Sequence, residues 1–229
     1  ALSPARLATI PDAVAVDAGW FYGLVLRSNG GLMAFGWNEF GELGDGSPLQ
    51  QPMPVAQSLP GVSVLGGAGF HTLALKTDGT LLSWGYNNGR LGDGTLFDRS
   101  IPGSVTGFNG VTAVAGGTYH SLALKSDGTV WAWGTNSKGQ LGLGTTMSSN
   151  TPAQVPGLTG IVSIGAGGQS SYAVRNDGTV WAWGYNVRGQ VRIGSNADAL
   201  TPVQVLGVTT AVAVASGAQH AQKHGRPLL

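Results

Sequence analysis

HSLALKSDGTVWAWGTNSKGQLGLG, residues 120–144, decides the fold, because the chain repeats it three more times. The related stretches are YGLVLRSNGGLMAFGWNEFGELGDG (22–46), HTLALKTDGTLLSWGYNNGRLGDG (71–94) and SSYAVRNDGTVWAWGYNVRGQVRIG (170–194). Self-similarity at a period of about 50 residues indicates a repeat architecture.

Each copy has the pattern of a β-hairpin. LALK alternates apolar and polar residues, which suits a half-buried strand. Asp-Gly or Asn-Gly follows, and this pair predicts a two-residue type I′ turn, because both residues tolerate positive φ. TVWAWG then predicts a second strand rich in β-branched and aromatic residues. A glycine-rich loop completes the phrase.

The repeat divides the chain into units of four expected strands. A short strand such as VTAVAGG opens each unit, and a proline-containing strand closes it. Proline fits an edge strand or the first residue of a strand, where no ladder N–H is needed. The prolines in question are Pro4, Pro54, Pro102, Pro152 and Pro202. The expected segments are the last strand of a preceding unit (1–13), four full units (14–61, 62–110, 111–160 and 161–210), and a partial unit with an irregular or disordered tail (211–229).

Composition excludes several classes of function. The 12 basic and 11 acidic residues give a net charge of +1, so we expect no broad nucleic-acid surface. The chain has no cysteine, which excludes disulfides, thiol catalysis and cysteine-based zinc sites. No apolar run approaches the ~20 residues that span a bilayer, so no membrane partner is expected. The start at Ala1 predicts a processed product or a piece of a longer protein.

A known family shares these motifs. A-G-G-x-x-H-S-L-A-L at 115–124 and D-G-x-V-x-A-W-G-x-N-x-x-G-Q-L-G at 127–142 resemble the repeat of the regulator of chromosome condensation family. The resemblance covers about 3–220 and implies an all-β fold, a propeller whose complete form has seven blades. About four and a half four-stranded blades would form an incomplete, open ring.

The family's roles are diverse. Its eponymous member is a nucleotide exchange factor for a small GTPase and binds nucleosomes, a plant relative senses ultraviolet-B light, and a bacterial relative inhibits β-lactamases. The shared property is a rigid disc that presents loops to protein partners, and the fold does not choose among the roles. Photoreception is not expected, because the Gly-Trp-Arg-His-Thr motif of the light sensor is absent.

The repeated polar residues are interpreted as scaffold. His71 and His120 share one register position, so a turn histidine that bonds a neighbouring backbone group is favoured over a metal ring. Asp45 and Asp93 supply one carboxylate per loop, too few for calcium, and Asp78 belongs to a hairpin turn. No catalytic residue, cofactor or metal site is predicted. Arg192 stands where Gly44, Gly92 and Gly142 stand in other units, which predicts a strained fourth blade if φ there is positive.

Aromatic residues are the best candidates for contacts with a partner. Trp20 and Trp37 lie outside the core register of the strands, and exposed aromatics often anchor interfaces. The candidate partner-binding residues are Trp20, Phe21, Trp37, Phe40, Phe70, His71, Tyr119 and His120.

The sequence therefore favours a non-catalytic interaction scaffold. It would present the variable loops 46–53, 94–101, 144–151 and 194–201 to a protein partner or a glycan. The alternatives are a guanine-nucleotide exchange factor for a small GTPase and a carbohydrate-binding or carbohydrate-active propeller. Exposed blade edges also suggest a homodimer. Low charge, the lack of cysteine and many small polar residues favour a bacterial, extracytoplasmic protein.

Overall fold

The fold is built from antiparallel sheets of four strands each. The computed structural model describes residues 10–57, 59–217 and 221–225, in which no helix occurs, and so none that could cross a membrane. Blade 1 contains β1 (Ala13–Ala18), β2 (Tyr22–Arg27), β3 (Leu32–Gly36) and β4 (Gln51–Gln57). Blade 2 contains β5 (Val62–Gly67), β6 (His71–Lys76), β7 (Leu81–Gly85) and β8 (Arg99–Ser104).

The next two blades repeat this order. Blade 3 contains β9 (Val111–Gly116), β10 (His120–Lys125), β11 (Val130–Gly134) and β12 (Ser149–Gln154). Blade 4 contains β13 (Ile161–Ala166), β14 (Ser170–Arg175), β15 (Val180–Gly184) and β16 (Ala199–Gln204). In every blade, strands pair in chain order, so the proline-containing fourth strand lies at the sheet edge, as the sequence predicted.

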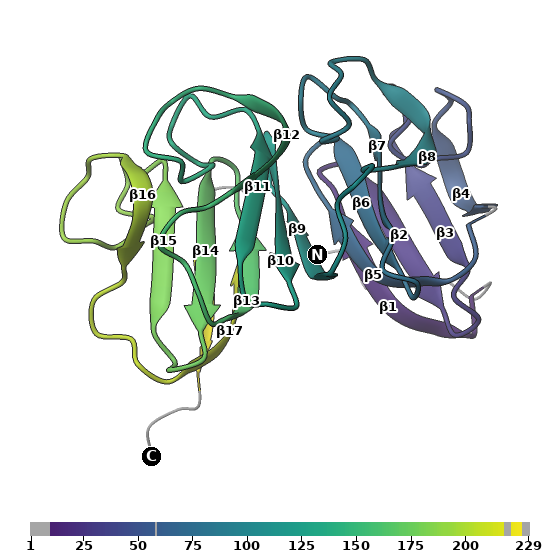
Figure 1. The fold of residues 1–229 in the computed structure, drawn as a ribbon. Helices are drawn as coiled ribbons and strands as arrows, with labels where there is room; N and C mark the ends of the chain where they lie inside the picture. The colour runs from purple at the N-terminus through teal and green to yellow at the C-terminus, as the bar shows by residue number, and fades with distance from the viewer. Residues whose placement is uncertain (1–9, 58, 218–220, 226–229) are drawn as a thin grey trace, which may run out of the picture.

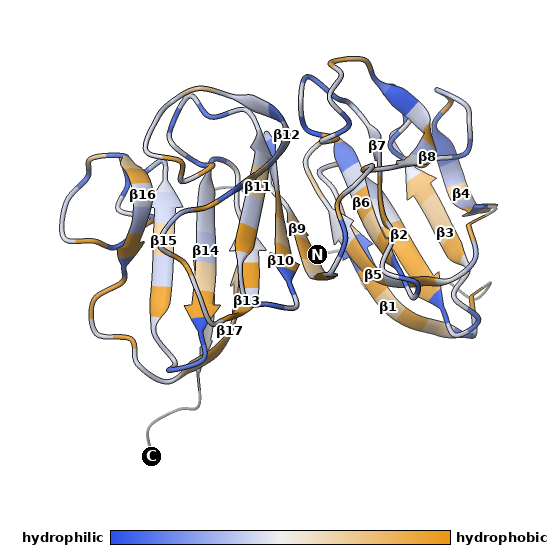
Figure 2. Cartoon of the chain, in the orientation of Figure 1, coloured by the Kyte–Doolittle hydropathy of each residue, from blue (hydrophilic) through white to orange (hydrophobic). Residues whose placement is uncertain are grey.

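Consecutive blades pack face to face around a shared axis. The contacts β2·β5, β6·β9, β10·β13 and β14·β17 join each blade to the next (Figure 1). Apolar residues lie along the strands (orange in Figure 2), and buried apolar side chains of neighbouring blades cluster together. At the axis, the inner loops of successive blades surround a hollow of about 260 Å³. The lining includes Gly19, Gly69, Gly117, Gly167 and Gly217.

One backbone carbonyl holds each of the first three seams. It belongs to the residue before Leu-Gly in the glycine-rich loop, and it accepts a hydroxyl and an indole N–H from the next blade. The Arg90 carbonyl accepts from Ser121 Oγ at 2.8 Å and Trp133 Nε1 at 2.7 Å. The Glu42 carbonyl accepts from Thr72 and Trp84, and the Gln140 carbonyl from Ser171 and Trp183. We call this paired contact the seam latch.

The hairpin turns differ from the predicted type I′. The Gly79 N–H donates to the Lys76 carbonyl and the Lys76 N–H to the Thr80 carbonyl, which gives a three-residue loop over 77–79. Gly79 has φ +83°, whereas Asp78 is not left-handed. This is a type I turn followed by a left-handed glycine. The Asp78 carboxylate accepts the Thr80 N–H at 2.9 Å, a bond that favours this longer loop.

The chain ends differ from expectation as well. The sequence predicted an irregular run after His220, but β18 (Ala221–Gly225) pairs with β17 (Ala211–Ser216) in a two-stranded sheet. Backbone hydrogen bonds to the edge of β17 need no alternating side-chain pattern, and hence the pattern gave no signal. The described part does not include residues 218–220 and 226–229. It also leaves out residues 1–9, which hold most of the strand expected in 1–13.

Candidate functional site

Two loops of each blade lie on the same face of the molecule. Neighbouring strands are antiparallel, so the loop after the first strand and the long loop after the third strand leave the sheet at the same end (Figure 1). The hairpins lie at the other end. Residues far apart in sequence are therefore brought together on the loop face.

Seven aromatic residues form a continuous strip on this face. The ring centroids lie 6.3 Å apart for Phe21–Trp37, 6.2 Å for Trp20–Phe21 and 5.1 Å for Trp20–Phe70. Phe40 continues the strip at 6.3 Å from Phe70 and 4.7 Å from Tyr86. We call the following set the aromatic strip: Trp20, Phe21, Trp37, Phe40, Phe70, Tyr86 and Tyr119.

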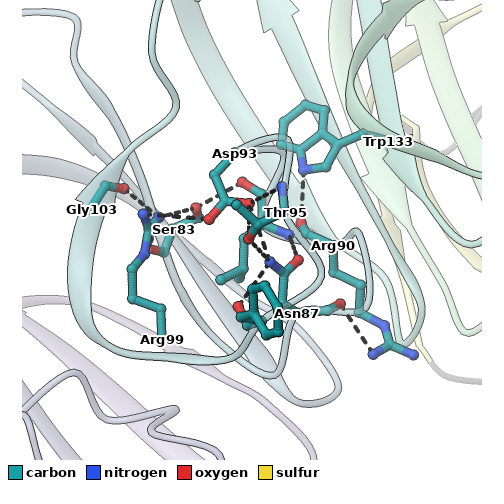
Figure 3. A network of polar contacts seen from close by, with 10 residues as sticks. Ser83, Asn87, Arg90, Asp93, Thr95, Arg99, Gly103 and Trp133 are labelled. Carbon is teal, nitrogen blue, oxygen red and sulfur yellow. Dashed lines mark hydrogen bonds and ion pairs between the residues drawn. The ribbon is translucent and has the colours of Figure 1, made fainter.

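Arg90 joins the last two rings of the strip. Its guanidinium carbon lies 4.4 Å from the ring centroid of Tyr86 and 5.3 Å from that of Tyr119. Such cation–π contacts are favourable when the cation is desolvated. The Arg90 side chain is only 4% exposed. In Figure 3 its carbonyl accepts the Trp133 indole N–H, and its guanidinium reaches back to the Asn87 carbonyl.

The strip is open to solvent and is hollowed in two places. Phe21 is 64% exposed and Trp20 45%, whereas the other five rings are half-buried. A hollow of about 920 Å³ is lined by Phe21, Trp37, Phe40, Phe70 and neighbours that include Pro52. A second, of about 230 Å³, lies toward blade 4, and its lining includes Trp20, Tyr119, Gln169, Tyr185 and Arg188.

Six of the eight residues predicted from the sequence lie in the strip. They are Trp20, Phe21, Trp37, Phe40, Phe70 and Tyr119. The other two, His71 and His120, are buried with no exposed surface, so a partner cannot reach them.

The histidines connect blades. His71 begins β6 and its Nε2 bonds Ser121 Oγ at 2.8 Å, and His120 bonds Ser171 Oγ at the same distance. The expected turn histidine with a backbone partner is therefore wrong, because the ring faces a hydroxyl across a seam. Burial and, to a smaller extent, the nearby Arg90 charge lower the pKa of His120 to about 3.

Sequence reasoning missed Tyr86 and Arg90. Tyr86 follows the glycine that ends β7, as Trp37 follows Gly36, so its register could have been recognised. Arg90 occupies the position of Glu42 and Gln140, and this disagreement between copies was its signal.

The outer loops of the same face are turns held by side chains. Asn87 Nδ2 donates to Asp93 Oδ1, Thr95 Oγ1 and the Phe97 carbonyl, at 3.0 to 3.2 Å (Figure 3). Arg99 closes this loop through Ser83 and Gly103. Asp45 likewise accepts the Ser47 N–H within its own turn. These loops display apolar side chains, and Phe97 is 82% exposed.

The loop face is suited to binding. Within the described ranges, no group of three or more histidine, cysteine or acidic residues could hold a metal ion. The strip instead combines exposed aromatic rings, two hollows and a buried cation. Exposed aromatic clusters of this kind commonly mark protein interaction sites.

Comparisons with known proteins agree with this architecture. The family model of the RCC1-like domain matches residues 2–222. The chain is 36% identical over 91 residues to the ultraviolet-B receptor UVR8 of Arabidopsis thaliana, a match covering 38% of this chain and 21% of UVR8. It is 37% identical over 108 residues to RUG3, a mitochondrial RCC1 domain-containing protein of the same plant, covering 45% of this chain and 24% of RUG3.

Solved structures show the same fold. Human WBSCR16 has a TM-score of 0.85 at 26% identity, and the match covers 95% of this chain and 58% of that one. Prp20p of Saccharomyces cerevisiae, which has binding properties to Gsp1p and histones, has a TM-score of 0.82 at 23% identity, covering 95% and 56%. The chain thus spans little more than half of these propellers, and its blades form an open part of the ring.

Proposed function

The chain belongs to the RCC1-like domain family, and from that premise we propose that it is a non-catalytic scaffold whose aromatic strip binds a protein partner. The observation that carries the proposal is the strip itself, because rings from three blades converge on one face. Rigid sheets hold the loops that bear them, so little ordering entropy is lost on binding.

A protein is the partner class that the relatives support. Prp20p has binding properties to Gsp1p and histones, and its structure is also known bound to Kap60. The exposed apolar loops around Phe97 and Met147 would widen the contact beyond the strip. Nucleotide exchange on a GTPase, glycan binding and homodimer formation have no comparable support here. The bacterial, extracytoplasmic origin stays a prediction.

Site-specific photo-crosslinking tests the proposal. A benzophenone amino acid at Phe21 should capture a partner protein, whereas the same group at Asp127, in a hairpin at the opposite end, should not. Excess unlabelled protein should compete with the capture. The double variant Trp20→Ala, Phe70→Ala should compete at least about tenfold less, because interface aromatics carry much of the binding energy. Equal capture at both positions, or full competition by the double variant, would contradict the proposal.

A further inference from the structure

One position of the repeat changes character in blade 2. In the other three blades, its side-chain oxygen accepts the N–H of the residue two places earlier. Glu42 accepts from Phe40 at 3.0 Å, Gln140 from Lys138 at 2.8 Å and Gln190 from Arg188 at 2.8 Å. Arg90 stands at the same position, and arginine has no acceptor atom.

The loop of blade 2 is altered at the same place. One residue fewer separates Asn87 from Arg90 than separates Asn38 from Glu42. Asn88 has the left-handed φ of +44° that the shorter turn requires. The Arg90 side chain therefore leaves its own turn and lies between Tyr86 and Tyr119.

The Arg90 cation lacks a strong partner. Nη1 donates to the Asn87 carbonyl at 3.4 Å, and Nε is buried without a hydrogen bond. Within the described ranges, no carboxylate forms an ion pair with Arg90. The Asp98 carboxylate attracts the Arg90 charge without contact, because Asp98 Oδ1 accepts the Asn87 N–H. A buried charge that is left unpaired is costly, so an added anion would relieve an existing cost.

The surroundings favour an acidic partner. Arg188 lines the hollow between Tyr185 and Tyr119, and Lys138, which pairs with Asp198 at 3.9 Å, lies 5.5 Å from the ring centroid of Tyr185. Cations and rings thus alternate from blade 2 to blade 4. A net charge of +1 for the whole chain provides no extended basic surface for a polyanion.

We propose that Arg90 receives a carboxylate, from an Asp or Glu side chain of the protein partner, while apolar neighbours in that partner cover the aromatic strip. This inference rests on the proposed function and adds the chemistry of the partner. Planar guanidinium and carboxylate groups suit one another, and the two tyrosine rings hold the guanidinium in place.

Two matched peptides test the inference. Acetyl-Leu-Asp-Leu-Asp-Leu-Asp-Leu-amide and its Asn counterpart differ in charge but hardly in shape. Binding is followed by isothermal titration calorimetry. The native protein should prefer the Asp peptide by at least about tenfold, because a charged pair at a desolvated site is worth more than a neutral contact.

The variant Arg90→Gln should remove this preference and bind both peptides equally. The change leaves the latch carbonyl in place, and glutamine is the residue at the equivalent position in blades 3 and 4. Arg175→Gln is the matched control, since Arg175 also lies over a ring, that of Trp181 at 4.4 Å, but ends β14 next to a hairpin. The control should keep the preference.

The outcomes separate the two proposals. Equal binding of both peptides by the native protein overturns the carboxylate and leaves the aromatic strip as a binding surface. A preference that survives Arg90→Gln overturns the role of Arg90, as does failure of the Asp peptide to bind. Tighter binding of a phosphoserine version than of the Asp peptide also overturns it, in favour of a phosphorylated partner. The photo-crosslinking result does not depend on any of these outcomes.

Discussion

At the scale of single residues, the position before Leu-Gly separates two tasks. Its carbonyl holds the next blade, and that contact is the same for Glu42, Arg90 and Gln140. Its side chain is not part of the latch and differs in each of these blades. The repeat therefore keeps its backbone contact while the chemistry of the loop face varies.

Glu42 gives the first prediction. Burial raises the pKa of its carboxyl to about 7, and Oε1 has no hydrogen bond among the described residues. A pKa raised on folding stabilises the protein at low pH, and this stability is lost as pH rises from about 4.5 through about 7. Glu42→Gln should therefore raise the free energy of unfolding at pH 8 by about 2 kcal/mol and change it little at pH 5. Urea unfolding at both pH values measures the difference, and an equal gain at both would contradict the assigned cause.

Arg192 gives the second prediction. Its φ is +53°, where Gly142 in blade 3 has +71°, so the strain expected from the sequence is confirmed. Arg192→Gly should raise the free energy of unfolding by about 1 kcal/mol, as measured in urea. The reverse change, Gly142→Ala, should cost more, because its Cβ would lie 2.9 Å from Trp183 Nε1. A destabilised Arg192→Gly variant would show that the Arg192 side chain makes contacts that outweigh its strain.

The residue scale also shows what sequence can reveal. Disagreement between copies identified Arg192, and the same comparison could have identified Arg90. The inaccessibility of His71 and His120 could not be deduced, because it depends on a serine about 50 residues later, in the next blade. Repetition alone does not tell a buried repeated residue from an exposed one.

At the scale of elements, the seams between blades are the main stabilising feature. Each latch places an indole, a hydroxyl and a histidine or tyrosine ring within one buried group. Buried polar groups that are hydrogen-bonded across an interface fix the relative position of packed elements. The seam, more than the single sheet, is therefore the unit that determines blade geometry.

His120 gives the third prediction. Its pKa is about 3 in the folded protein, below the ordinary value of 6.5, so the unfolded chain takes up a proton first as pH falls. Stability should be lost between about pH 6.5 and pH 3. The variant His120→Gln has no imidazole to titrate, so its free energy of unfolding does not carry this pH dependence. The difference in free energy of unfolding between the native protein and the variant should shrink by up to about 1.4 kcal/mol per pH unit between pH 6 and 4.

A double-mutant cycle completes the test of this seam. Combining His120→Gln with Ser171→Ala should give a coupling energy of about 1 kcal/mol at pH 7. The same cycle between His120 and the distant Ser63, whose Oγ donates to the Leu75 carbonyl, should give none. No coupling across the seam would contradict the inter-blade hydrogen bond.

The strands were predicted correctly as elements, but the second strand of each blade is buried along most of its length and not half-buried. Blades 2 to 4 have a neighbouring blade on each face, which covers both sides of this strand. The hairpins were correct as elements, but the turn type was wrong, because the carboxylate of Asp78 stabilises a longer loop. β18 was missed because its pairing with β17 uses backbone groups, which carry no sequence pattern. The last two errors concern contacts of the main chain.

At the scale of the whole molecule, the seams are unequal. The fourth differs from the first three in the described structure, because Ala221 stands where Ser171 and Ser121 stand, and the Gln190 carbonyl accepts Tyr172 Oη of its own blade at 3.3 Å. Stability in repeat proteins is close to a sum of local terms and neighbour interfaces. The β17–β18 sheet should therefore open more readily than blades 2 and 3.

Hydrogen exchange gives the fourth prediction. Amides of β17 should exchange at least about tenfold faster than those of β13 and β9, which occupy the same place in blades with complete latches. Peptide-level mass spectrometry resolves these segments. Uniform protection of the three strands would show that the latch adds nothing to blade stability.

The large-scale architecture was the most predictable feature. Four copies of the repeat in register predicted four blades, because similar sequences form equivalent sheets. The aromatic strip was less predictable: six of its residues were named individually, but their adjacency follows from the meeting of loops from three blades at the axis. No local pattern encodes that meeting.

At the position before Leu-Gly, the carbonyl joins the blades and the side chain contributes to the loop face, so the chemistry of that face can be changed by substitution. The side chains at 42, 90, 140 and 190 are an acid, a base and two amides. Because the latch at 42, 90 and 140 uses the backbone carbonyl, the side chains there can change while the contact between blades remains. A combinatorial library at these three positions would be a compact source of new recognition surfaces.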